Sequence, residues 1–209
     1  MSGFKIPGIT VYRLGIYARI LEQLLEEGRE LISSEELAKE CGVNSAQLRK
    51  DLSYFGQFGV RGIGYSVPQL LKHIKRILGT DREWPMVIAG VGHLGQAFLN
   101  YNLLAKRGFK FVAAFDIDEK KIGRVINDVY VYSIEQLPYV LREHNVEIGV
   151  ITTPSHAAQE VADLFIKHGI RGILNFAPVR IQHPPGVVVE HSDITILFDK
   201  LAFYMHRLD

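Results

Sequence analysis

A glycine turn of the form GxGxxG occupies residues 90–95, and its neighbours indicate what chemistry it can do. The apolar segment 86–89 precedes the turn, a helical pattern over 94–106 follows it, and a second apolar run, 111–115, ends on Asp116. A strand, a glycine turn, a helix, a second strand and a carboxylate about 20 residues downstream form a dinucleotide-binding fingerprint. The spacing predicts that the turn holds a pyrophosphate through Gly90, Val91, Gly92, His93, Leu94 and Gly95.

Each glycine of the turn has its own expected role. Gly90 permits the tight turn out of the strand, Gly92 lets a pyrophosphate approach the backbone, and Gly95 lets the helix pack closely on the strand. The helix N-terminus offers free N–H groups and partial positive charge to the phosphates. Asp116, with Asp118 close by and no arginine beside it, would accept hydrogen bonds from ribose hydroxyls and repel a 2′-phosphate. NAD(H) is therefore expected rather than NADP(H); the alternative is a structural glycine turn.

The chain beyond Asp116 alternates between strand and helix patterns. Strands are expected at 129–132, 147–152, 171–176 and 187–190, with helices at 134–144 and 155–168. This alternation predicts a Rossmann-like parallel sheet, which binds ligands at the carboxyl ends of its strands. Two loops that follow strands are expected near the nicotinamide: Thr152, Thr153, Pro154, Asn175, Phe176, Ala177 and Pro178.

The first 80 residues have a different character and predict a helix-turn-helix. Helices are expected at 10–27, 34–41 and 46–55, the second opened by a serine cap and the third by Asn44 or Ser45. The first helix would bury an apolar stripe of Leu14, Ala18, Leu21, Leu24 and Leu25. The third carries polar residues able to reach bases and phosphates from the major groove: Ser45, Gln47, Arg49, Lys50, Ser53 and Tyr54.

Residues 56–65 contain four glycines around Arg61, which predicts a tight β-hairpin, the wing of a winged helix. From its tip Arg61 can enter a narrow A·T minor groove, where the potential is most negative. A further helix is expected from Val67-Pro68. It would bury Leu70, Leu71, Ile74, Ile77 and Leu78 and turn Lys72, Lys75 and Arg76 outward.

The charges of this N-terminal part are separated along the chain. Residues 1–80 hold 11 Lys or Arg and 8 Asp or Glu, a net charge of +3, whereas the whole chain has +1. Seven glutamates lie between Glu22 and Glu40, while residues 45–76 carry six basic residues and one acid, Asp51. One acidic and one basic face are expected of a small nucleic-acid-binding module. A protein–protein helix-turn-helix is the alternative.

The rest of the composition excludes several classes of protein. A single cysteine, Cys41, excludes an internal disulfide framework and a thiolate metal cluster, and the eight histidines lack ligand spacing, so no metal is expected. No apolar run reaches membrane-spanning length. The N-terminus lacks a secretory signal, so a cytoplasmic location is expected.

Several strings resemble the Rex family of redox-sensing repressors. They are residues 49–56, 59–65, 90–95, 115–118 and 172–178, and they follow the same order over nearly the whole chain. The resemblance implies a winged-helix DNA-binding domain at 1–80, a Rossmann domain at 81–192 and a domain-swapped dimerisation helix at 193–209. It further implies a cytoplasmic bacterial homodimer that represses transcription on double-stranded operator DNA and releases it when NADH rises relative to NAD⁺.

The resemblance also adds site residues. It implies that Tyr65 contacts DNA, that Ile117 contacts the coenzyme, and that Asp193 acts as a switch near the partner's nicotinamide site. Asp193 would exchange partners between Tyr101 and Arg19, with Tyr101 and Asp193 both close to the coenzyme. The alternative for Asp193 is a helix N-cap. An aromatic residue often follows this aspartate in the family, but Ile194 stands here, so a stacking contact on the nicotinamide is not expected.

The C-terminal segment carries an apolar stripe that must be covered: Leu197, Leu201, Tyr204 and Leu208. A terminal helix with such a stripe can dock on its own chain or on a partner subunit.

Two other functions stay open. A dehydrogenase needs an acid or base at the nicotinamide and a substrate domain, yet no histidine–carboxylate pair stands out, although His93 and His156 lie in predicted ligand loops. Only one helix of chain follows the Rossmann unit, so no enzyme activity is expected. The third possibility is a sensor that binds coenzyme A.

Overall fold

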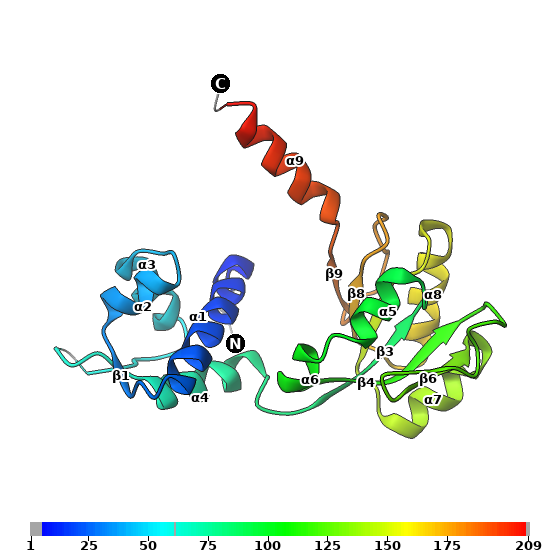
Figure 1. Ribbon diagram of the computed structural model, residues 1–209, viewed down its shortest axis with the longest axis horizontal. Coiled ribbons are helices and arrows are strands. Elements are labelled where there is room, and N and C mark those ends of the chain that lie inside the picture. The colour runs from blue at the N-terminus through cyan, green and yellow to red at the C-terminus, as the bar shows by residue number, and fades with distance from the viewer. Residues whose placement is uncertain (1–5, 61, 208–209) are drawn as a thin grey trace. The chain divides into compact units, whose positions relative to one another are not determined.

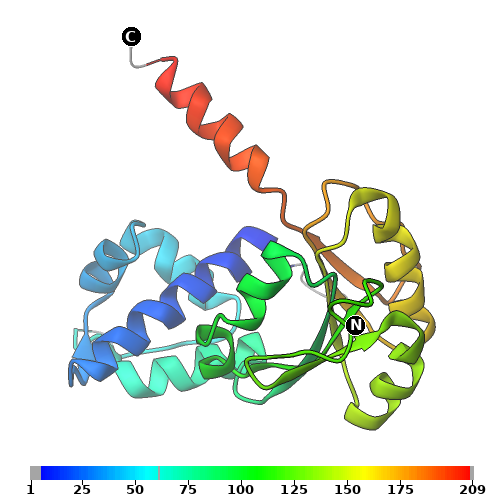
Figure 2. The ribbon, with the colours of Figure 1, turned by 45° about the vertical axis from the view of Figure 1, so that its right-hand side comes forward.

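The computed structural model describes residues 6–60 and 62–207, so Arg61 and Leu208 lie outside the described residues. The chain divides into two compact units, Met1–Arg82 and Glu83–Asp209. Figures 1 and 2 show the helical first unit in blue to cyan and the second unit, built around a sheet, in green to red.

The first unit is a small helical domain with two short strands. Its elements are α1 (Gly8–Glu26), β1 (Leu31–Ile32), α2 (Ser34–Glu40), α3 (Ser45–Ser53), β2 (Tyr65–Ser66) and α4 (Val67–Leu78). Ser33 accepts a hydrogen bond from the Glu36 backbone, and the Glu36 carboxylate accepts one from the Ser33 backbone, so a capping box begins α2. Asn44 caps α3 through the backbone N–H of Gln47. The predicted helix-turn-helix is therefore present.

One expectation for this unit is wrong. Leu25 is 43% exposed, because Leu21 and Leu24 already fill the buried side of the last turns of α1. Lys75, which was expected to point outward, is partly exposed, and its ammonium lies 2.8 Å from the carboxylate of Glu22 on α1.

The wing is less regular than the predicted hairpin. A single antiparallel bridge joins Val60 to Gly64, and β2 then pairs with β1. Gly64 has φ +102°, and a Cβ there would collide with the carbonyl oxygen of Ile32. This close approach of the wing to β1 explains why the segment needs glycine at this position.

The second unit is a seven-stranded sheet with the order β5-β6-β4-β3-β7-β8-β9, parallel except for the β5–β6 pair. Its strands are β3 (Trp84–Ala89), β4 (Phe109–Asp116), β5 (Val125–Ile126), β6 (Val129–Ser133), β7 (Ile148–Ile151), β8 (Gly172–Asn175) and β9 (Val188–His191). Its helices are α5 (His93–Leu99), α6 (Leu103–Lys106), the 3-10 turn η1 (Ile134–Gln136), α7 (Leu137–His144), α8 (Ser155–Lys167) and α9 (Ile194–Met205). The predicted Rossmann-like sheet is confirmed.

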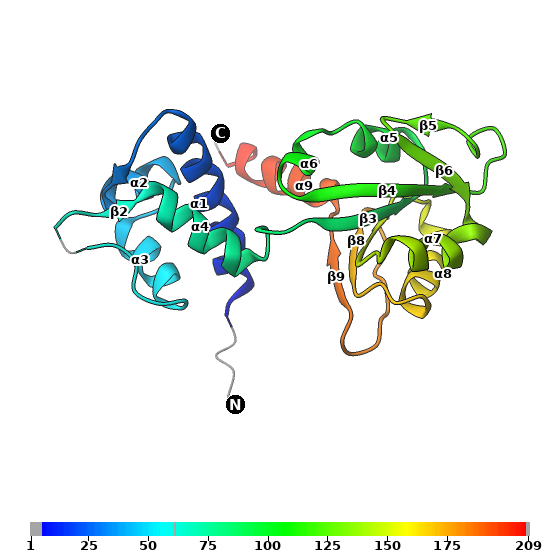
Figure 3. The ribbon, with the colours of Figure 1, turned by 90° about the horizontal axis from the view of Figure 1, so that it is seen from below.

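The two faces of this sheet are covered differently. Helices α7 and α8 lie on one face, and α5 lies on the other (Figure 3). The α7–α8 side holds the larger core, which includes Phe115, Leu137 and Phe165. The α5 side leaves a shallow apolar hollow of about 330 Å³ between Phe98, Phe111 and neighbouring strand residues.

The single helix predicted over 94–106 is wrong, because the chain forms α5 and α6 with a break at 100–102. The side-chain amide of Asn127 donates to the carbonyl of Leu99 at 2.8 Å. The side-chain amide of Asn100 donates to the carbonyl of Gln96, also at 2.8 Å. Side-chain donors thus satisfy carbonyls at the end of α5, where the helix stops.

Helix α9 buries none of its side chains within the chain. Its apolar surface is wider than the predicted stripe, because Ile194, Ile196, Phe198, Phe203 and Met205 are exposed together with Leu197, Leu201 and Tyr204. An isolated helix with apolar residues on all sides is normally covered by another surface.

Candidate dinucleotide and nucleic-acid sites

A cavity of about 700 Å³ opens in the second unit beside Ala89, Asp116 and Thr152, at the carboxyl ends of β3, β4 and β7. The chain passes from β3 to β4 on one side and later to β7 on the other. This is the topological switch point at which open α/β sheets bind ligands.

The glycine turn forms one wall of this cavity. Gly90 has φ +94°, and a Cβ there would lie 2.8 Å from the carbonyl oxygen of Thr152. A Cβ on Gly95 would collide with the carbonyl oxygen of Gly90, which agrees with close packing of α5 on the turn. A Cβ on Gly92 would instead face open space. The backbone is therefore bare where a phosphate can approach it.

Asp116 lies at the floor of the cavity with only 9% of its surface exposed. Its carboxylate accepts hydrogen bonds from the backbone N–H groups of Val91 (2.7 Å), Ile117 (2.9 Å) and Asp118 (2.9 Å), and from the Lys121 ammonium (3.1 Å). Burial raises the pKa of this carboxyl, but the hydrogen bonds and Lys121 outweigh burial and leave the pKa below its usual range. Asp116 is thus ionised, and Lys121 is the side-chain donor that an incoming hydroxyl can displace.

Two threonines after β7 complete the polar lining. The Thr152 hydroxyl donates to the carbonyl of Gly90 at 2.7 Å and so ties β7 to the glycine turn. The Thr153 hydroxyl is buried and has no hydrogen-bond partner among the described residues. Buried hydroxyls normally have partners, so an unpartnered one lining a cavity fits a bound polar ligand.

The structure brings most predicted coenzyme residues to this cavity. Those that line it are Gly90, Gly92, Leu94, Asp116, Ile117, Asp118, Thr152, Thr153, Pro154, Phe176, Ala177 and Pro178. His156, which lies in a predicted ligand loop, also lines the cavity. Sequence analysis missed several further lining residues: Lys121, Ile134, Ala157, Glu160, Val161 and Leu164. Most of these lie on α8 or in the turn after β4, where only the tertiary fold reveals proximity.

Other predicted residues of the second unit are not among those that line the cavity. Val91, Gly95 and Asn175 are buried. The Asn175 side-chain amide donates to the carbonyls of Ala177 (3.0 Å) and Val179 (2.8 Å), so it shapes the loop after β8. His93 is exposed at the start of α5.

The residues of the implied switch belong to different units, Arg19 to the first and Tyr101 and Asp193 to the second. Arg19 is exposed on α1 of the first unit, and Tyr101 lines a smaller hollow beside Asn102 and Asn127. The Asp193 carboxylate accepts hydrogen bonds from the Thr195 backbone (2.9 Å) and hydroxyl (2.7 Å). The helix N-cap named as the alternative for Asp193 is therefore present.

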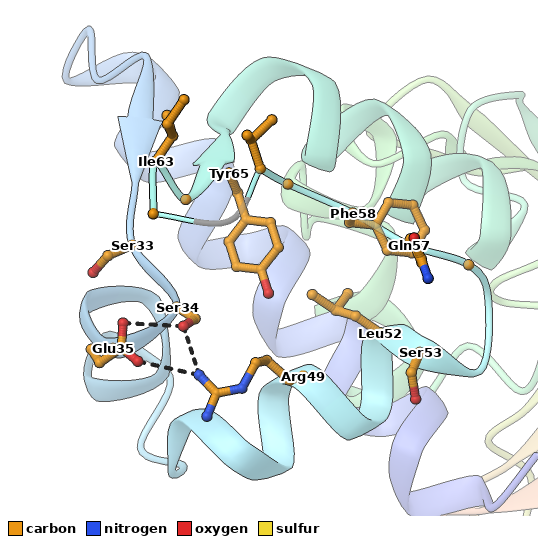
Figure 4. A pocket seen from close by; sticks show the side chains of 15 residues that line it. Ser33, Ser34, Glu35, Arg49, Leu52, Ser53, Gln57, Phe58, Ile63 and Tyr65 are labelled. Carbon is orange, nitrogen blue, oxygen red and sulfur yellow. Dashed lines mark hydrogen bonds and ion pairs between the residues drawn. The ribbon is translucent and has the colours of Figure 1, made fainter.

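In the first unit, α3 carries the predicted DNA-contacting side chains. Arg49, Lys50, Ser53 and Tyr54 are exposed on it. A hollow of about 650 Å³ lies between α2, α3 and the wing (Figure 4).

The Arg49 guanidinium already has partners on α2. It donates to the Ser34 hydroxyl at 2.9 Å and to the Glu35 carboxylate at 3.2 Å, as the dashed lines in Figure 4 show. Lys50 makes no ion pair with the described residues and is the freer cation.

Gln47 and Tyr65 make contacts with other residues of the first unit. The Gln47 amide donates to the Asp51 carboxylate at 2.8 Å. Tyr65 is 6% exposed and packs in the core, where burial raises the pKa of its phenol. Ser45 is half-buried, and Arg61 lies outside the described residues.

Other kinds of site are not found in the described part of the chain. Residues 6–60 and 62–207 contain no cluster of His, Cys, Asp or Glu that could bind a metal. None of the described helices is long and apolar enough to span a bilayer. Cys41 is half-buried, and burial raises the pKa of its thiol to about 12, so it is a poor nucleophile.

Two family models match parts of the chain. "Putative DNA-binding protein N-terminus" matches residues 5–53, and "CoA binding domain" matches residues 81–179. These matches fall in the first and second unit respectively.

Relatives that match the full length of the chain identify the family more specifically than these two models. "Redox-sensing transcriptional repressor Rex" from Syntrophobacter fumaroxidans is 49% identical, with 98% of each chain covered. The protein of the same name from Carboxydothermus hydrogenoformans is 47% identical over 99% of this chain and 100% of the relative.

Two solved structures of RSP, a Rex-family repressor, are also similar. The complex with β-NAD⁺ and operator DNA has a TM-score of 0.93 and 34% identity, covering 98% of this chain and 94% of RSP. The complex with β-NADH has a TM-score of 0.88 and 32% identity, covering 98% and 96%. By full-length sequence and fold, this chain belongs to the Rex family of redox-sensing transcriptional repressors.

Proposed function

We propose that this protein is a transcriptional repressor that binds operator DNA when NADH is low and releases it when NADH binds. One observation carries the proposal. A single chain joins a helix-turn-helix unit with an exposed basic helix to a dinucleotide cavity, and a threonine hydroxyl in that cavity has no partner within residues 6–60 and 62–207. The similar RSP protein has structures with β-NAD⁺ and operator DNA and with β-NADH.

Different residues of the cavity would bind different parts of the coenzyme. The bare backbone at Gly92 would hold the pyrophosphate. The ribose hydroxyls would displace Lys121 and donate hydrogen bonds to Asp116. Thr153 would supply its free hydroxyl to a polar atom of the coenzyme. The coenzyme supplies the signal, because its nicotinamide ring is positively charged when oxidised and neutral when reduced.

We propose the domain limits 1–80 for DNA binding, 81–192 for the coenzyme and 193–209 for dimerisation. The exposed apolar helix α9 supports the last of these, since a second copy of the chain would cover it. In a dimer, the two α3 helices must stand about one helical turn of DNA apart to bind both half-sites. In the proposed switch, Asp193 exchanges Tyr101 for Arg19 as this spacing changes.

The response to NADH is a linkage of two binding equilibria. A ligand shifts a conformational equilibrium only by its difference in affinity for the two states. A nearly complete shift needs about 5 kcal/mol. Reciprocity then requires operator DNA to weaken NADH binding by the same factor that NADH weakens DNA binding.

The test selects duplexes from a random pool with the purified full chain and titrates the gel shift with each coenzyme form. We expect retained DNA with NAD⁺ and released DNA with NADH. The proposal fails if no duplex is selected or if both forms act alike.

A coenzyme A sensor is a second candidate because the family model over residues 81–179 carries that description. Coenzyme A has a 3′-phosphate on its ribose, which the ionised Asp116 would repel. We therefore expect NADH, and not coenzyme A, to raise the melting temperature; the opposite result would favour this candidate. Sustained NADH oxidation with added substrates would instead indicate a dehydrogenase.

A further inference from the structure

A fully buried carboxylate lies in the middle of α3, the helix proposed to bind DNA. Asp51 is 0% exposed, whereas its neighbours Arg49 and Lys50 on the same helix are exposed. Burying an ionised group is costly unless it is paired and hydrogen-bonded. A residue that must overcome this cost needs a physical explanation.

The partners of Asp51 come mainly from α1. The Arg13 guanidinium binds it with both arms, Nε to Oδ2 at 2.6 Å and Nη2 to Oδ1 at 2.7 Å. The Tyr17 hydroxyl donates at 2.8 Å and the Thr10 hydroxyl at 3.2 Å. The Gln47 amide, one turn earlier on α3, adds a bond at 2.8 Å. Three side chains of α1 thus converge on one side chain of α3.

This arrangement constrains more than the distance between the helices. Apolar contacts such as those of Leu14 and Leu48 hold α1 and α3 together but tolerate small rotations and slides. A two-armed guanidinium–carboxylate contact is planar and directional, so it defines both the rotation and the axial position of α3. Specifying register is the best-attested use of a buried polar group.

We propose that Asp51 is a positioning residue for DNA recognition: its bonds to Thr10, Arg13 and Tyr17 hold α3 in the single register that operator binding requires. The inference rests on the proposed DNA-binding function. Asp51 itself is buried and does not touch DNA; it acts by orienting the exposed residues of α3 that can reach bases, such as Arg49 and Ser53.

The test compares affinity for a duplex selected by the wild-type protein with affinity for its scrambled sequence, at one fixed salt concentration. Contacts to phosphates position the protein without specifying sequence, whereas base contacts need a defined register. We expect Asp51→Asn to lower affinity for the selected duplex about tenfold and affinity for the scrambled duplex less than about twofold. NADH affinity should be unchanged.

Three further variants separate positioning from stability. The double variant Asp51→Asn with Arg13→Met removes the unpaired guanidinium, so we expect it to recover thermal stability without recovering sequence discrimination. Ile74→Val on α4 shortens a core side chain outside the Asp51 cluster, and it should lower the melting temperature but keep discrimination. Tyr17→Phe deletes one hydrogen bond and keeps the ring, so it tests the proposal where Asp51→Asn does not fold; we expect discrimination to fall about threefold.

Unchanged discrimination in Tyr17→Phe or in any folded Asp51 variant would overturn the proposal. Recovery of discrimination together with stability in the double variant would also overturn it and assign Asp51 a purely stabilising role. If the wild-type chain selects no duplex, the proposed function itself fails, and this outcome is distinct from both.

Discussion

Two buried aspartates, one in each unit, are satisfied in different ways. Asp51 accepts hydrogen bonds from four side chains and is closed to solvent, whereas Asp116 accepts mainly from backbone N–H groups and borders a cavity. Among the described residues, Lys121 is the one side-chain donor to Asp116; it is partly exposed and has Asp118 as a second partner at 3.7 Å. A carboxylate enclosed by side chains holds helices in place, and a carboxylate with one displaceable donor can receive a ligand.

The largest effect on stability is expected from a change at Asp51, the enclosed carboxylate. Asp51→Asn leaves the Arg13 guanidinium without its counter-charge, and breaking a buried pair costs about 3 kcal/mol or more. Hydrogen-exchange mass spectrometry should show faster exchange in α1 and α3 and unchanged exchange in β3 and β4. Equal acceleration in both units would contradict the local role of this pair.

The same carboxylate predicts an acid dependence of the first unit. Burial raises the pKa of Asp51, but hydrogen bonds from Arg13, Tyr17 and Gln47 outweigh burial, and the folded pKa lies below its usual value. The unfolded chain therefore binds the proton more readily, so this stabilisation is complete above about pH 4 and is lost as the pH falls further. Acid unfolding followed by circular dichroism should show a weaker dependence in Asp51→Asn than in wild type. Acid-unfolding curves with the same pH dependence in both proteins would contradict this role of Asp51.

Asp116→Ala probes the carboxylate at the cavity. Losing a charged acceptor for the ribose hydroxyls should weaken NADH binding at least about tenfold, while affinity for the selected duplex without coenzyme stays within about twofold. Isothermal calorimetry and a gel shift measure the two affinities. Equal loss of both would indicate misfolding rather than a ligand contact, so thermal unfolding of the same variant is the control.

Lys50→Ala removes the freer cation of α3. Affinity should fall by about the same factor for selected and scrambled duplexes, and the slope of binding against salt should decrease by about one, as expected for a phosphate contact. Lys72→Ala, an exposed cation on α4, is the matched control. A loss confined to the selected duplex would mean that Lys50 contacts a base.

The smallest effect on NADH affinity is expected from a change at Lys121, the displaceable donor. Lys121→Met removes one of the two donors to Oδ2 of Asp116 and leaves the Val91 N–H in place, so NADH affinity should rise by up to about threefold, because the ribose no longer displaces an ammonium. Isothermal calorimetry measures this change in NADH affinity directly. A loss comparable to that of Asp116→Ala would show that Lys121 itself holds the coenzyme.

Local patterns were enough to predict much of this molecule. Alternating strand and helix segments predicted a parallel sheet, and the spacing from Gly90 to Asp116 predicted a dinucleotide site where the cavity lies. The capping sequence at Ser33 predicted where α2 begins. These features depend on residues close in sequence, where periodicity and turn chemistry decide the structure.

Contacts between distant residues could not be predicted in the same way. Asp51 was counted as a single acid among basic residues, and its partners on α1 are 34 to 41 positions away. Asn127 helps to end α5 from 28 positions away, which no helical pattern over 94–106 records. Tyr65 is of a residue type that often contacts DNA, but the fold places it in the core.

The most direct test measures binding of the full chain to its selected duplex by fluorescence anisotropy, with NADH or NAD⁺ at equal concentration. Coenzyme control of DNA binding predicts that NADH releases the duplex and that NAD⁺ leaves it bound. Identical binding curves with the two forms would contradict it.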